Sequence, residues 1–460
     1  MTHTITQVLV SRCLDDGPGL IGEAELANAR KCLLDGLAVA HAARGQEGLD
    51  ILRKVASSSG EPSLAGLIGS PDSVGVDSAC LINGMAISVL LFDDNHASMR
   101  GHPTAPILPV ALALGEELDL SLDKALRAFV LGYEVESWLG LWFNPSQYEI
   151  GWHATATQGT LGATVTAAYL LGLDQEQARR ALGIAGSMLG GVRANFGTMT
   201  MSYHSGLAAS AGVRAARLSQ AGFTANPDIL DGPLSIGSAL SREWDAQAAR
   251  ASVETICAPF QIVAPGPIFK IYPCGRPTLP GVDCVMELRR GHGVRAEDVA
   301  EILCEVSFMY PRTLIHPRPK TGLQGKTSLE YCVAAALLDD GPRMSSFTDE
   351  AVARPEIQRL IDVTRVVVPP HLGEDVPDVR KRPFDQPVTV RITTHSGETV
   401  SAVVADHRGM PDNPATDEDM RHKFIACSEE MFDEARADAV MAYLTAPDSS
   451  VRGLRALVKG

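Results

Sequence analysis

The stretch TATQGTLGATVTAAYLLGL, residues 155–173, and the QEQARRALGIAGSML that follows it, residues 175–189, indicate the fold class of this chain. Their apolar residues recur at helical spacing, and Ala and Gly are abundant between them. Gly172 and Asp174 stand at the junction, as expected where one helix ends and the next begins. Two further segments share the spacing, 23–43 and 122–141. We therefore expect a large helical domain.

The composition changes near residue 260, and β signals follow. Six prolines between residues 258 and 280 indicate a connection between domains. Val388, Val390 and Ile392 alternate with polar residues, a turn follows, and 400–405 returns, which predicts a β-hairpin. Further strands are expected at 302–309 and 363–369, and helices at 327–338 and 356–361.

These signals predict a mostly α protein with two domains. We expect an all-helical domain over 1–265, completed by the helical residues 406–460, which pack back on it. A smaller α+β domain is expected over 266–405.

Length and charge exclude several classes of protein. The chain has 460 residues, 45% of them hydrophobic and 21% charged, which excludes a disordered protein and suits two or three domains. Its 40 Lys and Arg against 55 Asp and Glu give a net charge of −15, the wrong sign for binding nucleic acid or an anionic membrane. A small anionic substrate stays compatible with this charge, because a few local cations decide the sign of a pocket.

The cysteines and the apolar stretches predict a soluble, cytoplasmic protein. The nine cysteines are scattered and never spaced C-x-x-C, which argues against a disulfide framework and a structural zinc site. Residues 1–20 lack the basic start and apolar run of a signal peptide. The longest apolar stretch, 79–92, is interrupted by Asn83 and is too short to span a bilayer.

Familiar cofactor and metal motifs fail in their context. The glycines at 291–296 follow a charged helical stretch rather than a strand, and Lys320 stands where a phosphate loop ending at 325–327 needs glycine. No G-x-S-x-G, HExxH or EF-hand pattern occurs. The histidines match no ligand spacing, so we expect no metal at His96, His102, His153 and His204.

Polar clusters in otherwise apolar, helical sequence carry the functional signal. A loop as densely charged as the first of them is seldom only a linker. The clusters are FDDNHASMRGHP (92–103), YEIGWHATAT (148–157), RANFGTMTMSYH (193–204) and KIYPCGR (270–276).

In these clusters and their surroundings the chain resembles the MmgE/PrpD family. The matching stretches cover most of the chain in the family's order: FDD with RGHPTAPILPVALALGEE (100–117), GYEVESWLG (132–140), GWHATATQGTLGA (151–163), LGLDQEQARRALGIAGS (171–187), NFGTMTMSYHSGLAASAGV (195–213), AGFTANPDILDG (221–232), FKIYPCGRPTLPGVD (269–283) and TGLQGKTSLEYCVAAAL (321–337).

The family includes 2-methylcitrate dehydratase, cis-aconitate decarboxylase and iminodisuccinate epimerase. The resemblance implies a helical domain, an α+β lid, a homodimer and a lyase or isomerase without an organic cofactor. Its reaction would be proton transfer at a carbon next to a carboxylate of a small di- or tricarboxylic acid. The stretch 99–103 and the spacing of 148–153 are closest to the epimerase branch.

The resemblance also implies roles for individual residues. His102 and His153 become acid–base groups at the reacting carbon, as suits a side chain with an ordinary pKa near 6.5. Tyr148 is a further acid–base candidate, and Asp93 or Asp94 would orient an imidazole or bind a substrate hydroxyl. Arg100 becomes a carboxylate clamp, because its planar fork grips a carboxylate with two hydrogen bonds. The remaining substrate-binding candidates are Asp94, Asn95, His204, Lys270 and Tyr310.

Each of these residues also has a purely structural explanation. His102 could mark a helix entry before Pro103, and His153 could cap the helix that follows it. Asp93 and Asp94 could cap a helix or pair with Arg100. The tyrosines could pack with satisfied hydroxyl groups, and Lys270 could be an ordinary loop charge.

Two positions depart from the family pattern. Met201 stands where relatives usually have Lys after the GTMT segment, and Leu279 stands where they usually have His. Losing a cation at 201 predicts a smaller or less charged substrate. The alternative is a non-catalytic or divergent member that binds a small carboxylate.

Overall fold

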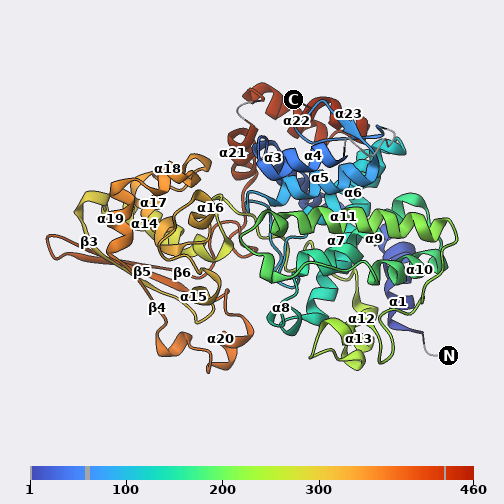
Figure 1. Cartoon of the computed structure of the whole chain (residues 1–460), viewed down its shortest axis with the longest axis horizontal. Helices are drawn as coiled ribbons and strands as arrows, with labels where there is room; N and C mark the ends of the chain where they lie inside the picture. The colour runs from blue at the N-terminus through green and yellow to red at the C-terminus, as the bar shows by residue number, and fades with distance from the viewer. Residues whose placement is uncertain (1–2, 57–62, 429–430, 460) are drawn as a thin grey trace. The chain divides into compact units, whose positions relative to one another are not determined.

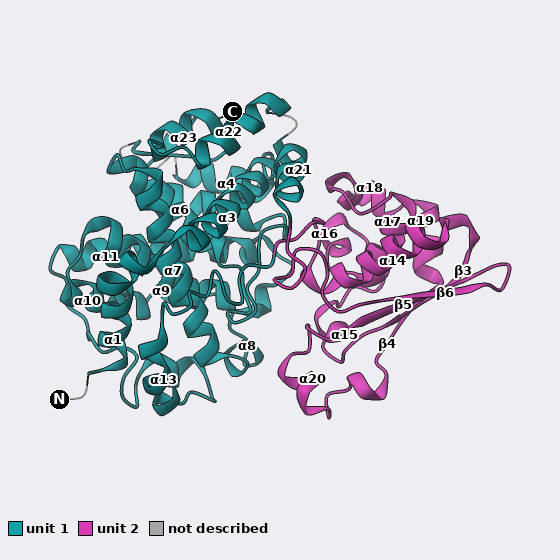
Figure 2. Ribbon diagram, turned by 180° about the vertical axis from the view of Figure 1, so that it is seen from behind, with its two compact units in different colours: residues 1–268, 416–460 teal, residues 269–415 magenta. Residues whose placement is uncertain are grey.

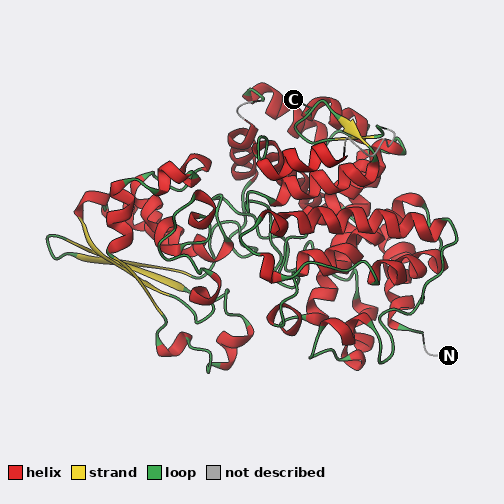
Figure 3. Ribbon diagram, viewed as in Figure 1, coloured by secondary structure: helices red, strands yellow, loops and turns green. Residues whose placement is uncertain are grey.

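The computed structural model describes residues 3–56, 63–428 and 431–459. The chain divides into two compact units, which Figure 2 colours separately. Unit 1 contains residues 1–268 and 416–460, and unit 2 contains residues 269–415. Helices dominate unit 1, and unit 2 combines helices with a sheet (Figure 3). The prediction of a mostly α protein with a large helical domain and a smaller α+β domain is confirmed.

Unit 1 is a stack of helices around α9, drawn in Figure 1. A short pair of strands, β1 (Ala65–Gly66) and β2 (Ser73–Val74), accompanies the helices. The helices are α1 (Ile5–Ser11), α2 (Gly17–Leu20), α3 (Glu23–Ala42), α4 (Glu47–Ala56), α5 (Val76–Ser88), α6 (Thr104–Glu117), α7 (Leu122–Phe143), α8 (Ser146–Glu149), α9 (Ala154–Leu171), α10 (Gln175–Gly186), α11 (Met199–Gln220), α12 (Ile236–Leu240), α13 (Ala246–Ser252), α21 (Asp417–Ser428), α22 (Glu434–Leu444) and α23 (Val451–Val458).

Small residues let α9 sit at the centre of unit 1, in contact with α6, α7, α10 and α11. A Cβ placed on Gly162 would lie 2.7 Å from the carbonyl oxygen of Gly132 in α7, and one on Gly212 in α11 would lie 2.6 Å from the Cβ of Ala163. Larger side chains would push these helices apart. The abundance of glycine and alanine therefore reflects close helix packing.

The expected helix ends are confirmed. Gly172 ends α9 in the left-handed region at φ 65°, and the Asp174 side chain begins α10 by accepting a hydrogen bond from the Gln177 amide. The Ser121 side chain caps the start of α7 by accepting a hydrogen bond from the Lys124 amide. The apolar stretch 79–92 forms most of α5. Within the described residues, no helix has both the length and the apolar character needed to cross a bilayer.

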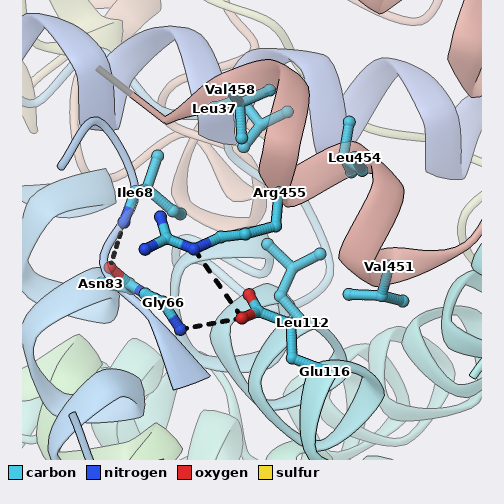
Figure 4. Close-up of a pocket in the computed structure, with 10 residues that line it drawn as sticks. All are labelled: Leu37, Gly66, Ile68, Asn83, Leu112, Glu116, Val451, Leu454, Arg455 and Val458. Carbon is cyan, nitrogen blue, oxygen red and sulfur yellow. Dashed lines mark hydrogen bonds and ion pairs between the residues drawn. The ribbon is translucent and has the colours of Figure 1, made fainter. Parts of the chain in front are cut away.

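The C-terminal helices return to unit 1. Helix α21 packs on α3, and α23 packs on α6. Figure 4 shows Arg455 of α23 reaching toward Glu116 of α6, 3.8 Å away, across a small cavity. The Arg455 guanidinium also donates to the carbonyl oxygens of Leu67 and Ser70 at 2.7 and 2.8 Å. None of the candidate site residues lines this cavity.

Unit 2 has a four-stranded sheet in the order β4-β3-β5-β6. Strand β3 (Val299–Glu305) is parallel to β4 (Thr364–Val367) and antiparallel to β5 (Val388–Thr394), which forms the expected hairpin with β6 (Thr399–Val404). The helices of this unit are α14 (Leu279–His292), α15 (Tyr310–Thr313), α16 (Gly322–Gly325), α17 (Leu329–Leu338), α18 (Asp349–Val352), α19 (Pro355–Asp362) and α20 (Pro377–Lys381).

The alternation of β5 fixes its buried face, because Val388, Val390 and Ile392 are fully buried while their neighbours are half-buried. One expectation here is wrong. The strand predicted over 302–309 ends at Glu305, and α15 begins at Tyr310. Pro311 explains the change, since proline cannot donate to a strand ladder but is favoured in the first turn of a helix.

Candidate functional site

A tightly folded loop connects α5 to α6 and carries the first polar cluster. Its backbone closes on itself, because the His96 amide donates to the Gly101 carbonyl at 3.1 Å and the Arg100 amide donates to His96 at 3.0 Å. Arg100 takes up the left-handed region, at φ 53°, to make this turn. A two-way backbone bridge between Asn95 and Ile268, at 2.9 and 2.8 Å, ties the loop down. The loop is thus a fixed support for its side chains.

Asp93 and His102 form a carboxylate–imidazole pair within this loop. The His102 Nδ1 atom lies 3.1 Å from the Asp93 carboxylate and 3.0 Å from the Asp94 carbonyl oxygen. Both neighbours are acceptors, so Nδ1 carries a proton and Nε2 of the neutral ring is left as the base. Asp93 is 1% exposed and His102 is half-buried. The pair has the arrangement that orients a catalytic imidazole.

Asp94 has a different task from its neighbour. Its carboxylate accepts hydrogen bonds from the hydroxyl and the amide of Thr104, at 2.9 and 3.4 Å, where α6 begins. Burial is the main cause that raises the pKa of Asp94 well above its usual range, and the charges of Asp35 and Asp93 add to it. The structure therefore gives Asp94 the helix-entry role that the sequence left open.

Asn95 lies beside the pair. The Asn95 amide nitrogen is 3.3 Å from the Gly101 carbonyl oxygen and 3.4 Å from Nε2 of His102. Arg100 is half-buried, and its backbone makes the turn described above. His96 points away from this pair, with its Nε2 atom 3.2 Å from the Gln261 carbonyl oxygen.

His153 and His204 form a second pair, between the start of α9 and the second turn of α11. Their Nδ1 atoms are 3.0 Å apart, and the side chains are 5% and 3% exposed. Burial lowers the pKa of His153 well below 6.5, and the charges of His102 and His204 lower it further. Burial also lowers the pKa of His204. A neutral pair shares one proton between the two Nδ1 atoms, so one ring presents Nε2 as a base and the other presents Nε2–H as an acid.

The two pairs belong to one site. The His102 amide donates to the Thr155 hydroxyl at 3.0 Å, which joins the loop to the first turn of α9, two residues after His153. Asp93 and His102 are close enough for their charges to act on the pKa of His153. Among the candidates from the sequence, the structure thus brings Asp93, His102, His153 and His204 together.

Tyr148 lies at the edge of this site in contact with Arg193, a residue that the sequence analysis quoted but did not select. The guanidinium of Arg193 lies 3.8 Å from the centre of the Tyr148 ring, and its Nη1 atom donates to the Tyr148 carbonyl at 2.9 Å. Arg193 also acts on the pKa of His153. The signal in the sequence was a cation inside a polar cluster, of the same kind that selected Arg100.

Lys270 and Tyr310 belong to unit 2. Lys270 is 1% exposed, and its charge lowers the pKa of Cys274 and of His407. Tyr310 is 1% exposed and lies in the hydrophobic core of unit 2, with its ring centre 5.8 Å from that of Phe384. Burial raises the pKa of Tyr310. Substrate contact by these two residues stays a prediction.

Glu134 and Gln261, which the sequence analysis did not select, support the loop through hydrogen bonds. Glu134 of α7 accepts hydrogen bonds from the amides of Cys257 and Gln261, at 2.7 and 2.6 Å. Gln261 in turn accepts from Ser98 at 3.0 Å. Burial raises the pKa of Glu134 to about 7. Only the fold brings these distant segments together, so no local signal could have found them.

Among the described residues, no group of three or more His, Cys, Asp or Glu side chains is arranged to hold a metal ion. The chemistry that the site offers is that of imidazoles, a carboxylate and a guanidinium. Such groups move protons and bind anions.

Comparison of the sequence with known proteins identifies relatives of this chain. The chain is similar to cis-aconitate decarboxylases of three organisms. The Mus musculus protein is 27% identical over 418 residues, 88% of this chain and 83% of that protein. The Homo sapiens protein is 29% identical over 364 residues, 77% and 73%. The Aspergillus terreus protein is 24% identical over 445 residues, 90% and 87%.

Family-level similarity covers both halves of the chain. The MmgE/PrpD N-terminal domain matches residues 21–249, which include every candidate of unit 1. The MmgE/PrpD C-terminal domain matches residues 272–444. The resemblance read from the motifs is confirmed: the chain belongs to the MmgE/PrpD family.

Proposed function

We propose that the protein is a lyase that acts on a small tricarboxylic acid of the cis-aconitate type. The observation that carries the proposal is the pairing of His102 with the buried Asp93 carboxylate beside the neutral imidazole pair of His153 and His204. The similarity to cis-aconitate decarboxylases supports the substrate class.

The reaction requires a positioned proton donor or acceptor at carbon. When CO₂ leaves, the bond between the carboxyl carbon and its neighbour breaks, and the electron pair stays on the substrate, where a conjugated double bond spreads it. A proton must then form the new C–H bond. In a dehydration the base removes a C–H proton, the electron pair forms the double bond, and the acid protonates the departing hydroxide.

His102 and His153 are the proposed proton-transfer groups. Asp93 holds the proton on Nδ1 of His102 and stabilises the imidazolium that forms when Nε2 takes up a proton. The proton shared between His153 and His204 lets His153 present either an acid or a base without gaining charge. A neutral ring suits this buried position, because burial disfavours an imidazolium.

The other candidates are proposed as binding groups. Arg100, Asn95 and Lys270 would hold the substrate carboxylates, with Tyr148 and Tyr310 as further contacts. The proposal needs no organic cofactor, and it takes the homodimer implied by the resemblance as the working form.

Two departures from the family pattern bear on the alternative of a member without catalysis. Leu279 is 1% exposed in the hydrophobic core of unit 2. Met201 is half-buried in the first turn of α11. Neither can act as an acid, a base or a cation, so the proposed chemistry rests entirely on the other residues.

Proton NMR in D₂O tests the proposal with cis-aconitate, citrate, 2-methylcitrate and iminodisuccinate. We expect conversion of cis-aconitate, with deuterium taken up at the protonated carbon. The variant His102→Gln should lower turnover by about 10²- to 10⁴-fold, the usual contribution of an acid–base group. The control His395→Gln changes an exposed histidine in the β5–β6 turn of unit 2 and should keep full activity.

Three outcomes would contradict parts of the proposal. Full activity of His102→Gln would remove His102 from the mechanism. Epimerisation of iminodisuccinate alone would favour the epimerase branch that the motifs suggested. Tight binding of an acid without conversion or deuterium exchange would favour a non-catalytic binding protein.

A further inference from the structure

Arg193 is held rigidly beside the histidine pair. The segment that carries it runs antiparallel to the segment before α9, through a bridge between Trp152 and Val192. The His153 amide donates to the Gly191 carbonyl at 3.0 Å, and the Arg193 amide donates to the Gly151 carbonyl at 2.8 Å. The backbone of Arg193 is therefore registered against the residues that carry His153.

Gly191 is required for this close approach. It lies in the left-handed region at φ 83°, and a Cβ on it would lie 2.4 Å from the Cβ of Ala156 and 3.2 Å from the His204 ring. The glycine thus lets the chain pass directly beside the histidine pair and deliver Arg193 to its edge.

The guanidinium of Arg193 is positioned from two sides. Its Cζ atom lies 3.8 Å from the centre of the Tyr148 ring, and Nη1 donates to the Tyr148 carbonyl at 2.9 Å. The ring of Phe196 lies on the same guanidinium at 5.7 Å. An arginine held in this way loses little conformational freedom on binding an anion, which favours affinity.

One donor group of Arg193 stays available to a ligand. Within the part of the chain that the structure describes, no carboxylate forms an ion pair with Arg193, and its one side-chain hydrogen bond runs from Nη1 to the Tyr148 carbonyl. Its Nε atom is buried out of reach of solvent, whereas Nη2 of the half-buried side chain has no acceptor. A charged donor without a partner favours an anion, so Nη2 can donate to a carboxylate oxygen.

We propose that Arg193 binds one carboxylate of the substrate through Nη2 and places the reacting carbon beside His153. This inference rests on the proposed function for the identity of the substrate, and it adds a specificity-determining cation that the motif analysis did not select. Tyr148 then acts as the platform for Arg193, through its ring face and its carbonyl oxygen.

Binding and kinetics of two Arg193 variants test the inference. The probe for binding is tricarballylate, a tricarboxylate without a double bond or hydroxyl group, measured by calorimetry. Arg193→Gln should weaken tricarballylate binding by about 10- to 100-fold, the range for a lost hydrogen bond to a charged group. Arg193→Lys keeps the charge but loses the planar guanidinium that stacks on Tyr148, and should fall between Arg193→Gln and the wild type.

Kinetics on the substrate from the NMR panel separate positioning from folding. Arg193→Gln should raise KM together with the Kd of tricarballylate while the melting temperature stays within about 2 °C of the wild type. The matched control is Arg214→Gln on α11, whose guanidinium forms an exposed ion pair with Asp77. It should leave KM and Kd unchanged, because surface ion pairs contribute little.

The outcomes distinguish this inference from the proposed function. Wild-type affinity for tricarballylate in Arg193→Gln would overturn the role of Arg193, whatever the reaction. A wild-type protein that binds tricarballylate but converts no acid would overturn the lyase and leave the binding comparison valid. A wild-type protein that neither binds nor converts any of these acids would overturn both.

Discussion

His102 and His153 lie in one site but have opposite neighbours. The neighbour of His102 is a buried carboxylate, and the neighbour of His153 is a second imidazole, 3.0 Å away between the Nδ1 atoms. A carboxylate stabilises an imidazolium that forms during a reaction, whereas a buried imidazole pair favours the neutral ring. Such different environments allow two side chains of the same type to act as acid and as base.

The lowered pKa of His153 predicts the pH dependence of activity. Burial is the largest cause of the shift, so His153 stays neutral below pH 6.5, where an unperturbed histidine would be protonated. The acid limb of kcat/KM set by His153 should therefore lie below pH 6.5. Initial rates between pH 4.5 and 8.5 on the acid identified by NMR measure it.

Asp93→Asn supplies the matched variant for this pH profile. Asp93 raises the pKa of His153, so removing its charge should move the acid limb of His153 to still lower pH, in addition to lowering kcat. A wild-type acid limb at pH 6.5 or above would exclude a neutral, buried His153 as the group that limits the rate.

The sequence predicted which residues form the site, but not which partner each side chain contacts. The sequence selected His102, His153, Asp93 and His204, which lie in one cluster. It could not tell that the Asp94 carboxylate binds Thr104 at the start of α6 while Asp93 pairs with His102, because the direction of adjacent side chains in a loop depends on the local backbone conformation. It did not select Arg193, because the contact with Tyr148 joins positions 45 residues apart.

At the scale of elements, α21 brings a buried cation to the site loop. Lys423 Nζ lies 2.6 Å from the Asp35 carboxylate of α3, donates to the Phe92 carbonyl at 2.7 Å, and lies 3.8 Å from the centre of the Phe92 ring. The side chains of Lys423 and Asp35 are 3% and 0% exposed. Phe92 directly precedes Asp93, so this helix of the C-terminal segment anchors the loop that carries the carboxylate–imidazole pair.

Removing Lys423 should destabilise unit 1 strongly. Lys423→Met leaves the Asp35 carboxylate buried without its cation, which typically costs about 3–5 kcal/mol. The double variant Asp35→Leu with Lys423→Met removes both charges and should recover most of that loss. Urea unfolding followed by tryptophan fluorescence measures both, since Trp138, Trp142, Trp152 and Trp244 all lie in unit 1.

Arg421 provides the control on the same helix. It forms exposed ion pairs with Glu434 and Asp438, so Arg421→Met should cost no more than about 1 kcal/mol. Equal unfolding midpoints for Lys423→Met and Arg421→Met would show that the buried pair does not anchor α21.

The helices could be predicted from the periodicity of the sequence, but the anchoring contacts of Lys423 could not. The spacing of apolar residues and the residues at helix ends predicted α7, α9 and α10. The strand predicted over 302–309 extends too far, because the apolar Val306 and Phe308 continue the β pattern although the strand ends at Glu305 and Pro311 lies in the first turn of α15. The contact from Lys423 to Phe92 spans 331 residues, and local patterns carry no information on such a distance.

At the scale of the whole molecule, the ordered set of motifs predicted the family and hence the architecture. The pattern of the sequence predicted a helical region, a region with strands and the return of the helical C-terminal residues to the first domain, but not the contacts that hold those helices there. The C-terminal helices return to unit 1, and His41 of α3 is part of what holds them. Its Nδ1 accepts from the Ser428 hydroxyl at 2.9 Å, and its Nε2–H donates to the Val458 carbonyl at 3.2 Å.

His41 should make the stability of unit 1 dependent on pH. Burial lowers its pKa from 6.5 to about 4, so between these values the unfolded chain binds a proton that the folded chain does not. Stability from this group is complete above pH 6.5 and falls by about 1.4 kcal/mol per pH unit as the pH drops toward 4, roughly 3 kcal/mol in all. Protonation also turns Nδ1 into a donor and so breaks the hydrogen bond from Ser428.

Gln cannot titrate, so the difference in unfolding free energy between His41→Gln and the wild type should shift in favour of the variant between pH 7 and pH 4.5. The shift should reach most of that amount, because pH 4.5 still lies above the pKa of the folded state. Tryptophan-detected urea unfolding of both proteins at pH 7, 6, 5 and 4.5 measures the shift, and a constant difference across this range would mean that His41 does not link α3 to the C-terminal helices as a neutral ring.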